Sequence, residues 1–283
     1  MTATDRHIQI RGPGAIILTG PSSCGKGEVA KAMCEMLEIP PDHWLSMGGI
    51  LRSVFERARD DAGFVAALET RHAITDRRPI FETPDITDAL RTKIETHQAG
   101  LTRMLAARTG ARARPGGWQS VTALDWLEYC TTHGLLVPNR WTQAFIAAHI
   151  ETASQLRAKP LILDGYPRTR IAAEHLLGVL DAARTPVLKV LHLSISKQEM
   201  LHRAGLRQRA DDDPAALLKR YEFYIESVQP SVDYMKDRLG SEAIALIDAH
   251  QPSYDMKDGT RVLNLNRSIA NVVRSCIQAL TAD

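Results

Sequence analysis

Short apolar runs along the chain, each closed by a small or polar residue, predict the strands of one sheet. Such runs cover 14–20, 161–164 and 187–195. The first precedes a stretch with helical spacing of apolar residues over 28–38, and another helical stretch near 170–182 separates the second from the third. Because strands alternate with helices, we expect a parallel sheet covered by helices on both faces.

Two further apolar segments near the C-terminus, 242–248 and 260–266, also have the character of strands. Their patterns do not decide which of the two belongs to the central sheet. A helix over about 268–280 is expected after them, because its apolar residues recur at helical spacing.

Helical spacing dominates the middle of the chain, where breakers such as Pro79, Pro84 and Gly110 divide the segments. Helices are predicted near 50–70, 86–108, 120–132 and 139–157. The expected organisation is a core over 1–52, a helical insertion over 53–133 and a continued core over 134–283. The predicted fold class is α/β, with three α/β/α layers, a parallel sheet and an enlarged helical insertion.

Composition narrows the classes of partner and compartment. Charged residues make up 24% of the chain and the formal net charge is +2, which does not favour nucleic acid or acidic membranes as a bulk partner. No uncharged apolar run reaches the roughly 18 residues of a membrane span, and residues 1–14 lack the apolar region of a signal peptide. The dispersed cysteines suggest neither zinc nor disulfides, so we expect a reduced, cytoplasmic compartment.

The segment GPSSCGKGE, residues 20–28, lies between the first predicted strand and the first predicted helix. Gly20, Gly25 and Lys26 fit the pattern G-x-x-x-x-G-K of a P-loop, which turns backbone N–H groups and the positive end of a helix dipole towards phosphates. Gly27 and Glu28 follow the lysine in place of the usual Ser or Thr that binds Mg²⁺. We therefore expect the metal ion to be held elsewhere or through water.

The segment LILDGYPRT, residues 161–169, ends a buried strand on Asp164. Ligands of open α/β sheets bind at the carboxyl ends of the strands, so this carboxylate is a candidate to hold Mg²⁺ through its waters. Arg168 follows a Gly-Tyr-Pro turn, and its planar guanidinium suits bidentate binding of a phosphate. The alternative for Asp164 is a residue that only caps a helix or turn.

Arginines are concentrated between 203 and 220. Arg203 and Arg207 share one face of a predicted helix, Arg209 follows, and Arg220 lies on the next helix. Such cations neutralise the charge on a phosphoryl group during its transfer. The alternative is a solvated face of arginines paired with neighbouring aspartates.

The second of these helices is expected to begin at Asp213-Pro214, with an N-cap side chain and proline at the first helical position. The residues that it is expected to bury are Leu217, Leu218, Tyr221, Ile225 and Val228.

Together these segments resemble the adenylate kinase family of nucleoside monophosphate kinases. GPSSCGKG resembles the family's phosphate loop, SMGGILR (46–52) its S-T-G-D-x-L-R segment, and GLLVP (134–138) its G-x-L-V-P/S segment. LDGYPRT resembles L-D-G-F-P-R-T, and RADDDPAALLKR resembles R-x-D-D with a later arginine. The motifs occur in the family's order and leave about 53–133 and a segment near 249–260 unmatched.

The resemblance implies transfer of a phosphoryl group from ATP, with Mg²⁺, to a nucleoside monophosphate. The ATP-binding residues that it implies are Gly20, Ser22, Ser23, Cys24, Gly25, Lys26, Gly27, Glu28, Arg203 and Arg207. The implied catalytic residues are Lys26, Arg168, Arg203, Arg209 and Arg220. The implied acceptor-binding residues are Met47, Gly48, Arg52, Val137, Gly165, Arg168, Arg209 and Arg220. Asp164 would organise Mg²⁺ through water, and a short lid without zinc would lie near 203–212.

Two departures from the family's pattern fall on the acceptor side. Met47 stands where the family has a threonine that meets the AMP nucleoside, and Ala172 stands where it has the glutamine that reads adenine. Loss of a hydrogen-bonding side chain removes discrimination between bases, so the acceptor is either read by other residues or is not AMP. The alternatives are a different phosphorylated metabolite, a polynucleotide end, or a nucleotide-binding regulatory protein with little catalysis.

Arginines of the insertion raise the question of an anionic partner such as nucleic acid. They are Arg103, Arg108, Arg112 and Arg114. Because the insertion also carries many acidic residues, we favour a solvated helix end and loop. Trp118, Trp126 and Trp141 are expected in the hydrophobic core, and the sequence does not indicate an oligomeric state.

Overall fold

The structure is a computed structural model that describes residues 13–74, 78–83, 86–109, 116–133, 135, 137–152, 159–207 and 214–281. The chain forms two compact units. The sheet unit consists of Met1–Met47 and Ala153–Asp283, and the helical unit consists of Gly48–Thr152.

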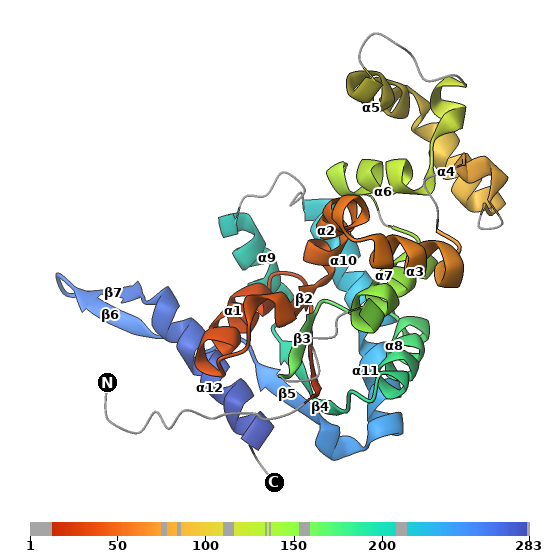
Figure 1. Cartoon of the computed structure of the whole chain (residues 1–283). Coiled ribbons are helices and arrows are strands. Elements are labelled where there is room, and N and C mark those ends of the chain that lie inside the picture. The colour runs from red at the N-terminus through yellow and green to blue at the C-terminus, as the bar shows by residue number, and fades with distance from the viewer. Residues whose placement is uncertain are drawn as a thin grey trace. The chain divides into compact units, whose positions relative to one another are not determined.

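Five parallel strands form the centre of the sheet unit, in the order β2-β3-β1-β4-β5 (Figure 1). They are β1 (Ala15–Thr19), β2 (Trp44–Ser46), β3 (Leu161–Asp164), β4 (Val187–Ser194) and β5 (Ile244–Asp248). β1 lies in the middle, and its register pairs Leu18 with Asp164 and Thr19 with His192. The carboxyl ends of three neighbouring strands therefore meet at one edge, beside the loop that begins at Gly20.

Helices cover both faces of this sheet, which confirms the predicted three-layer fold (Figure 1). α1 (Lys26–Met36) packs with α12 (Leu265–Thr281) on one face, and α8 (Arg170–Ala182) packs with α11 (Gln229–Leu239) on the other. The first pair of helices encloses a core in which Ile16 of β1, Met33 of α1 and Val273 of α12 are buried. Burial of such apolar surface is the main favourable term that holds the layers together.

The two candidate strands near the C-terminus take different places. Residues 244–248 form β5 of the main sheet, whereas β7 (Thr260–Leu263) pairs antiparallel with β6 (Tyr254–Lys257) in a separate two-stranded sheet. β2 had no counterpart in the sequence prediction, because its three half-buried residues are too few to show a strand period.

The remaining elements of the sheet unit follow β4. α9 (Lys197–Arg207) comes first, and α10 (Pro214–Phe223) continues through a π-helix over Tyr224–Val228 into α11. Short 3₁₀ turns lie at Pro41–His43 and Ser241–Ala243.

The burial predicted for α10 and the π-helix is wrong at two positions. Leu218 and Ile225 are exposed, whereas Leu217 and Val228 are buried as expected and Tyr224 is buried as well. Ile225 lies within the π-helix, which holds more residues in each turn than an α-helix, so the face that points to the core shifts along the sequence there. Leu218 lies on α10, before this shift begins. The regular helical period used for the prediction does not contain this shift.

The helical unit consists of α2 (Met47–Asp60), α3 (Ala62–His72), α4 (Asp88–Thr96), α5 (Gln98–Thr109), α6 (Ala123–Thr132) and α7 (Asn139–Thr152), with 3₁₀ turns at Ile80–Glu82 and Gly117–Ser120. Three of the helices begin at a polar cap. Asp61 and Thr87 accept hydrogen bonds from Phe64 N and Leu90 N, and Thr122 forms a capping box with Asp125. These caps satisfy backbone donors that a helix leaves unpaired at its start.

This unit extends beyond the 53–133 boundaries expected for the insertion, because α7 packs against α3. His149 of α7 meets the ring of Phe64 edge-on at 5.1 Å, and the Thr152 hydroxyl accepts a hydrogen bond of 2.9 Å from Arg57 of α2. Trp126 and Trp141 are buried in this unit, as predicted. Trp118 is only half-buried.

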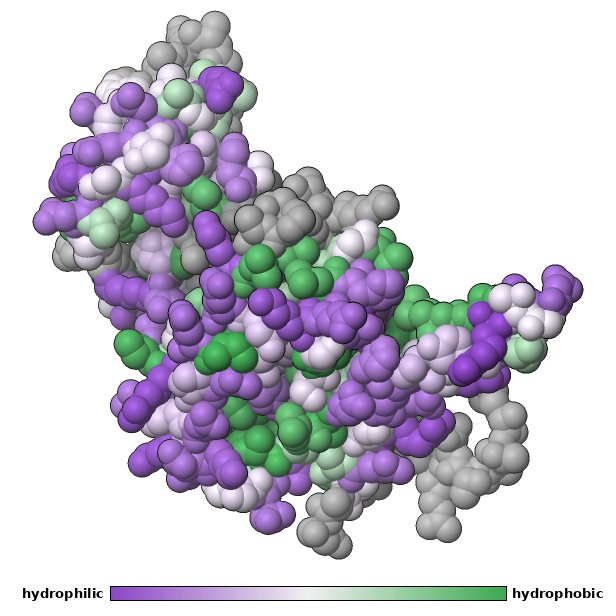
Figure 2. Space-filling view, turned by 180° about the vertical axis from the view of Figure 1, so that it is seen from behind, coloured by the Kyte–Doolittle hydropathy of each residue, from purple (hydrophilic) through white to green (hydrophobic). Residues whose placement is uncertain are grey.

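The exposed face in Figure 2 is a mixture of polar and apolar side chains. Within the parts of the chain that the structure describes, no helix is both long enough and apolar enough to cross a membrane.

Candidate active site

The segment 20–28 forms a loop that joins the end of β1 to the start of α1. Gly20 has a φ of 145°, and a β-carbon at this position would lie 2.3 Å from the carbonyl oxygen of Leu193. A side chain at Gly20 is therefore excluded both by the backbone conformation and by space. Gly25 is the N-cap of α1 with a φ of 91°, and no side chain caps the helix. The first N–H groups of α1 are left to bind an external anion.

Lys26 is folded into this loop. Its Nζ donates hydrogen bonds to the carbonyl oxygens of Gly20 at 3.0 Å and Pro21 at 2.8 Å, and lies 3.6 Å from Sγ of Cys24. The ammonium group is thus held at the centre of the loop. A phosphate oxygen that enters the loop would compete for the same protons with the advantage of a full negative charge.

Ser23 leaves a hydrogen-bonding group of the loop unsatisfied. Its φ is 59°, and its Oγ is buried without a hydrogen-bond partner among the described residues. A buried hydroxyl without a partner costs on the order of 1–3 kcal/mol. The loop therefore fits a ligand that offers oxygen acceptors. Ser22 lies half-buried in the same turn, Gly27 is half-buried in the first turn of α1, and Glu28 is exposed.

Asp164 occupies the carboxyl end of β3, beside the end of β1. Burial raises the pKa of its carboxyl group, whereas the positive charge of Lys26, the indole of Trp44 and the guanidinium of Arg168 lower that pKa. The carboxylate therefore lies within electrostatic reach of the phosphate loop. A cation brought to this edge of the sheet would offset the cost of keeping the negative charge partly buried.

Trp44 of β2 is a residue of this site that the sequence reasoning missed. Its side chain lies beside Asp164 and lowers the pKa of the carboxyl group. The register of the sheet explains this position, because β2 runs parallel to β3 and pairs Ser46 with Asp164. The signal was hidden because β2 itself could not be recognised from three residues.

Arg168 follows the turn after Asp164, and its Nε donates a hydrogen bond of 2.7 Å to the carbonyl oxygen of Gly165. Gly165 has a φ of 74°, and a β-carbon there would lie 3.3 Å from the guanidinium. Part of the Arg168 side chain is exposed to solvent, although protein surrounds its guanidinium group. Desolvation by this protein lowers the pKa of Arg168, Asp164 raises it, and Arg220 of α10 lowers it further. Arg220 therefore lies within electrostatic reach of Arg168, and an anion between the two guanidinium groups would relieve their repulsion.

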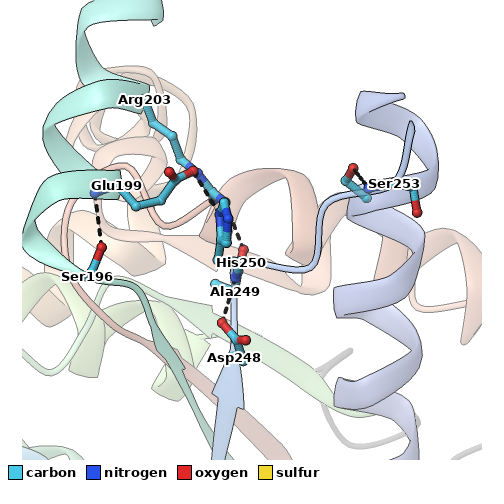
Figure 3. A network of polar contacts seen from close by, with 8 residues as sticks. Ser196, Glu199, Arg203, Asp248, Ala249, His250 and Ser253 are labelled. Carbon is cyan, nitrogen blue, oxygen red and sulfur yellow. Dashed lines mark hydrogen bonds and ion pairs between the residues drawn. The ribbon is translucent and has the colours of Figure 1, made fainter. Parts of the chain in front are cut away.

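Arg203 has a different environment, at the turn after β5 (Figure 3). Its Nε donates to Oε1 of Glu199 at 2.6 Å, and its Nη2 donates to the carbonyl oxygen of Ala249 at 3.0 Å. His250 Nδ1 lies 3.0 Å from the same Glu199 oxygen, and the backbone N–H of His250 donates to Asp248 at 2.8 Å. The structure thus uses Arg203 to join α9 to the segment that follows β5.

The other predicted site residues lie in the helical unit, at its start, or outside the described residues. Met47 is buried at the start of α2, Gly48 and Arg52 are exposed in its first turns, and Val137 is half-buried before α7. A β-carbon at Gly48 would lie 3.3 Å from Nη1 of Arg52, so the guanidinium runs back along the helix towards its start.

For several of the predicted arginines, the structure describes only the backbone or nothing at all. Arg207 ends α9, but its side chain lies outside the described residues, as does the whole of Arg209. In the helical unit Arg103 is exposed on α5, whereas the side chain of Arg108 and the whole of Arg112 and Arg114 lie outside the description. The predicted nucleic-acid contact through these arginines therefore stays a prediction.

The chemistry of the site suits a metal ion that brings most of its own ligands. Among the described residues, no three His, Cys, Asp or Glu side chains gather into a metal-binding group. Asp164 with the phosphate loop beside it fits an Mg²⁺ ion that is bound mainly by phosphate oxygens and water, as this ion prefers.

Sequence comparison decides the family. An adenylate kinase from Cyanothece sp. (strain PCC 7425 / ATCC 29141) is 32% identical over 245 residues, which cover 85% of this chain and 90% of that protein. The chain belongs to the adenylate kinase family. Adenylate kinases from Mycolicibacterium smegmatis and Mycolicibacterium paratuberculosis are 34% and 32% identical over 116 residues, or 41% of this chain. The matched part spans 63% of the length of these two relatives. No family model matches the chain.

Membership of the family gives the two departures on the acceptor side a structural meaning. Met47 and Ala172 are 5% and 3% exposed, so both positions present buried apolar groups where a base-reading hydrogen bond was expected. Lys26 and Arg168 carry positive charges within electrostatic reach of Asp164, whereas polar side chains are absent at the two described positions Met47 and Ala172.

Proposed function

We propose that this chain transfers the terminal phosphoryl group of ATP to a nucleoside monophosphate. The observation that carries the proposal is the set of charges at the carboxyl edge of the sheet, where Lys26 and Arg168 act electrostatically on Asp164 and Arg220 acts on Arg168. Two cations near one carboxylate leave an excess of positive charge. Phosphoryl transfer requires such an excess, because charge spreads over the oxygens of the group in transfer.

The phosphate loop receives the phosphates of the donor in this proposal. The N–H groups at the start of α1 and the Ser23 hydroxyl bind their oxygens, and Lys26 exchanges the carbonyl oxygens of Gly20 and Pro21 for phosphate. Mg²⁺ would be held through water by Asp164 and would neutralise part of the charge on the phosphates. Arg203, Arg207 and Arg209 are proposed to act on the donor, with a short lid near 203–212.

Arg168 and Arg52 are proposed to bind the acceptor phosphate, and Met47, Gly48, Gly165 and Val137 are proposed to bind its nucleoside. No general base is needed, because the acceptor phosphate is already anionic near neutral pH. The role of the protein is to align donor and acceptor and to exclude water, so that transfer to the acceptor outruns hydrolysis. Arg220 and Arg209 are proposed to stabilise the group in transfer.

The buried apolar side chains of Met47 and Ala172 favour a second candidate acceptor, a phosphorylated compound that is not AMP. The phosphate of a different nucleoside monophosphate, of a phosphorylated metabolite or of a polynucleotide end could bind to the same two arginines. None of these acceptors needs a side-chain amide that hydrogen-bonds to adenine. ATP binding without transfer to any acceptor would instead identify a nucleotide-binding regulatory protein.

The test is a coupled measurement of ADP formation from ATP with a panel of nucleoside monophosphates. Acceptor-dependent turnover that is lost in Lys26→Met supports the proposal. Turnover with none of the nucleoside monophosphates contradicts it, and a screen of other phosphorylated acceptors then tests the second candidate. If standard nucleotides compete for the acceptor site, the acceptor is a nucleoside monophosphate. If none of them competes, the acceptor is a different phosphorylated compound.

A further inference from the structure

A buried hydrogen bond joins the sheet to the π-helix next to the proposed active site. Nε2 of His192 lies 2.7 Å from Oη of Tyr224, and the two rings meet edge-on at 5.8 Å and 80°. Both residues are 6% exposed. The bond is therefore shielded from water, where the loss of one partner leaves the other unsatisfied.

The position of this pair connects it to the phosphate loop. His192 lies on β4 opposite Thr19, the residue of β1 that immediately precedes Gly20. The Gln229 side chain also approaches the Tyr224 hydroxyl, at 3.5 Å. Lys26 and Asp233 act electrostatically on His192, and Cys24 of the loop acts on Tyr224. The pair thus lies next to the end of β1, where the loop that holds Lys26 begins.

The same pair lies close in sequence to Arg220. Arg220 precedes Tyr224 by one helical turn, so the two residues lie on the same side of the helix. Tyr224 is the first residue of the π-helix, and π-turns within helices frequently occur at functional sites. The hydrogen bond from Tyr224 to β4 therefore restrains this helix from sliding along its axis or rotating about it. Such movement would shift the guanidinium of Arg220, which acts electrostatically on Arg168.

We propose that the Tyr224–His192 hydrogen bond positions Arg220 for phosphoryl transfer. This inference rests on the proposed function and extends it. Tyr224 and His192 are positioning residues, because they act through Arg220 and the phosphate loop. The π-helix is the local structure that allows Tyr224 to reach the strand while Leu218 and Ile225 remain exposed.

The first test removes the hydroxyl alone. In Tyr224→Phe we expect kcat to fall about tenfold, because a small displacement of a charged group from the reacting phosphoryl is costly, with a rise in KM for ATP and little change in KM for the acceptor. Tyr221→Phe, on the same helix and half-buried, is the matched control and keeps its kcat. A kcat for Tyr224→Phe equal to that of the control overturns the proposal.

A double-variant cycle tests whether Tyr224 acts through Arg220. In an Arg220→Met background, Tyr224→Phe is expected to change kcat no further, because its target is gone. Independent, multiplicative effects would overturn the positioning role. His192→Gln keeps a hydrogen-bonding side chain and is expected to retain most of the activity that His192→Leu loses; equal losses in these two variants would also overturn it.

A binding measurement separates this inference from the proposed function. We expect tripolyphosphate, measured by calorimetry, to bind Tyr224→Phe and Arg220→Met equally weakly relative to the unmodified chain and Tyr221→Phe. This outcome supports the positioning role even if no acceptor accepts a phosphoryl group. Wild-type affinity in Tyr224→Phe together with weak binding in Arg220→Met contradicts it, whatever the reaction is.

Discussion

The guanidinium of Arg220 on α10 lies close enough to that of Arg168 to lower its pKa. Asp164 acts on Arg168 in the opposite direction, from the end of β3. Two guanidinium groups from separate elements of the sheet unit thus lie within electrostatic reach of each other. An anion that binds between them would offset their mutual repulsion.

The first prediction concerns this pair. Replacing Arg220 by Met removes one of the cations that we expect to bind phosphate. The upward shift of the unfolding temperature by tripolyphosphate should shrink, since the shift depends on affinity for the folded state. Differential scanning calorimetry with and without tripolyphosphate measures this shift. A full ligand-induced shift in the variant would contradict the account.

The second prediction concerns Lys26. Replacement by Met should reduce kcat/KM roughly a hundredfold or more, because a charge aimed at the transferred group is lost. Lys31→Met is the matched control, because Lys31 is exposed on the same helix away from the loop. Steady-state kinetics at saturating ATP distinguishes the two variants. Equal losses would show that the effect is a general one on α1.

The third prediction compares two loop glycines. A β-carbon at Gly20 would clash with its neighbours, whereas one at Gly25 would only strain the backbone. Gly20→Ala should strongly disturb the loop, because its β-carbon would lie 2.3 Å from the Leu193 carbonyl oxygen. Gly25→Ala has nothing within 4 Å and should cost only about 1–2 kcal/mol for its left-handed conformation. Denaturant unfolding and nucleotide binding compare them. The account would be wrong if Gly20→Ala were the milder change.

The fourth prediction concerns Asp164 and magnesium. Asp164→Asn keeps the size of the side chain but removes its charge, so the Mg²⁺ concentration required for half-maximal activity should rise about tenfold or more. Asp248→Asn, at the carboxyl end of β5, is the control and should keep the wild-type requirement. Activity is titrated with Mg²⁺ after removal of metal with a chelator. An unchanged requirement in Asp164→Asn would exclude this carboxylate from metal binding.

The fifth prediction concerns the core of the helical unit. Burial lowers the pKa of His149 from 6.5 to about 4, so the folded protein holds this imidazole neutral. At a pH between these two pKa values, His149 is protonated in the unfolded chain and neutral in the folded chain. The free energy of unfolding therefore decreases as the pH falls through this range. The loss due to His149 should be about 2 kcal/mol between pH 7 and pH 5. Urea unfolding of the wild type and His149→Phe at both pH values measures it, and equal pH dependence in the two would refute this assignment.

The parallel sheet and the strand–loop–helix arrangement around residues 20–28 could be predicted because their signals are local. An apolar run that stops at Gly20, a glycine at the helix start and an acidic residue at the end of Leu161–Asp164 each determine their own surroundings. The carboxyl edge of a parallel sheet then brings them together without further information.

The remaining features depend on contacts between distant segments. β2 has only three residues, so the place of Trp44 beside Asp164 follows from pairing with β3. The burial of Tyr224 depends on a π-helix that a regular period does not describe. The environment of Arg203 likewise depends on Ala249 and His250, which lie far along the chain after β5.

The central claim is that the charges around Asp164 serve the transfer of a phosphoryl group to an acceptor. The most direct measurement follows the γ-phosphoryl group of labelled ATP in the presence of each nucleoside monophosphate and separates labelled nucleoside diphosphate from free phosphate. We predict label on at least one nucleoside diphosphate, with loss of that product in Arg168→Met and Lys26→Met. ATP that binds but yields no labelled nucleoside diphosphate with any of these acceptors would contradict the claim.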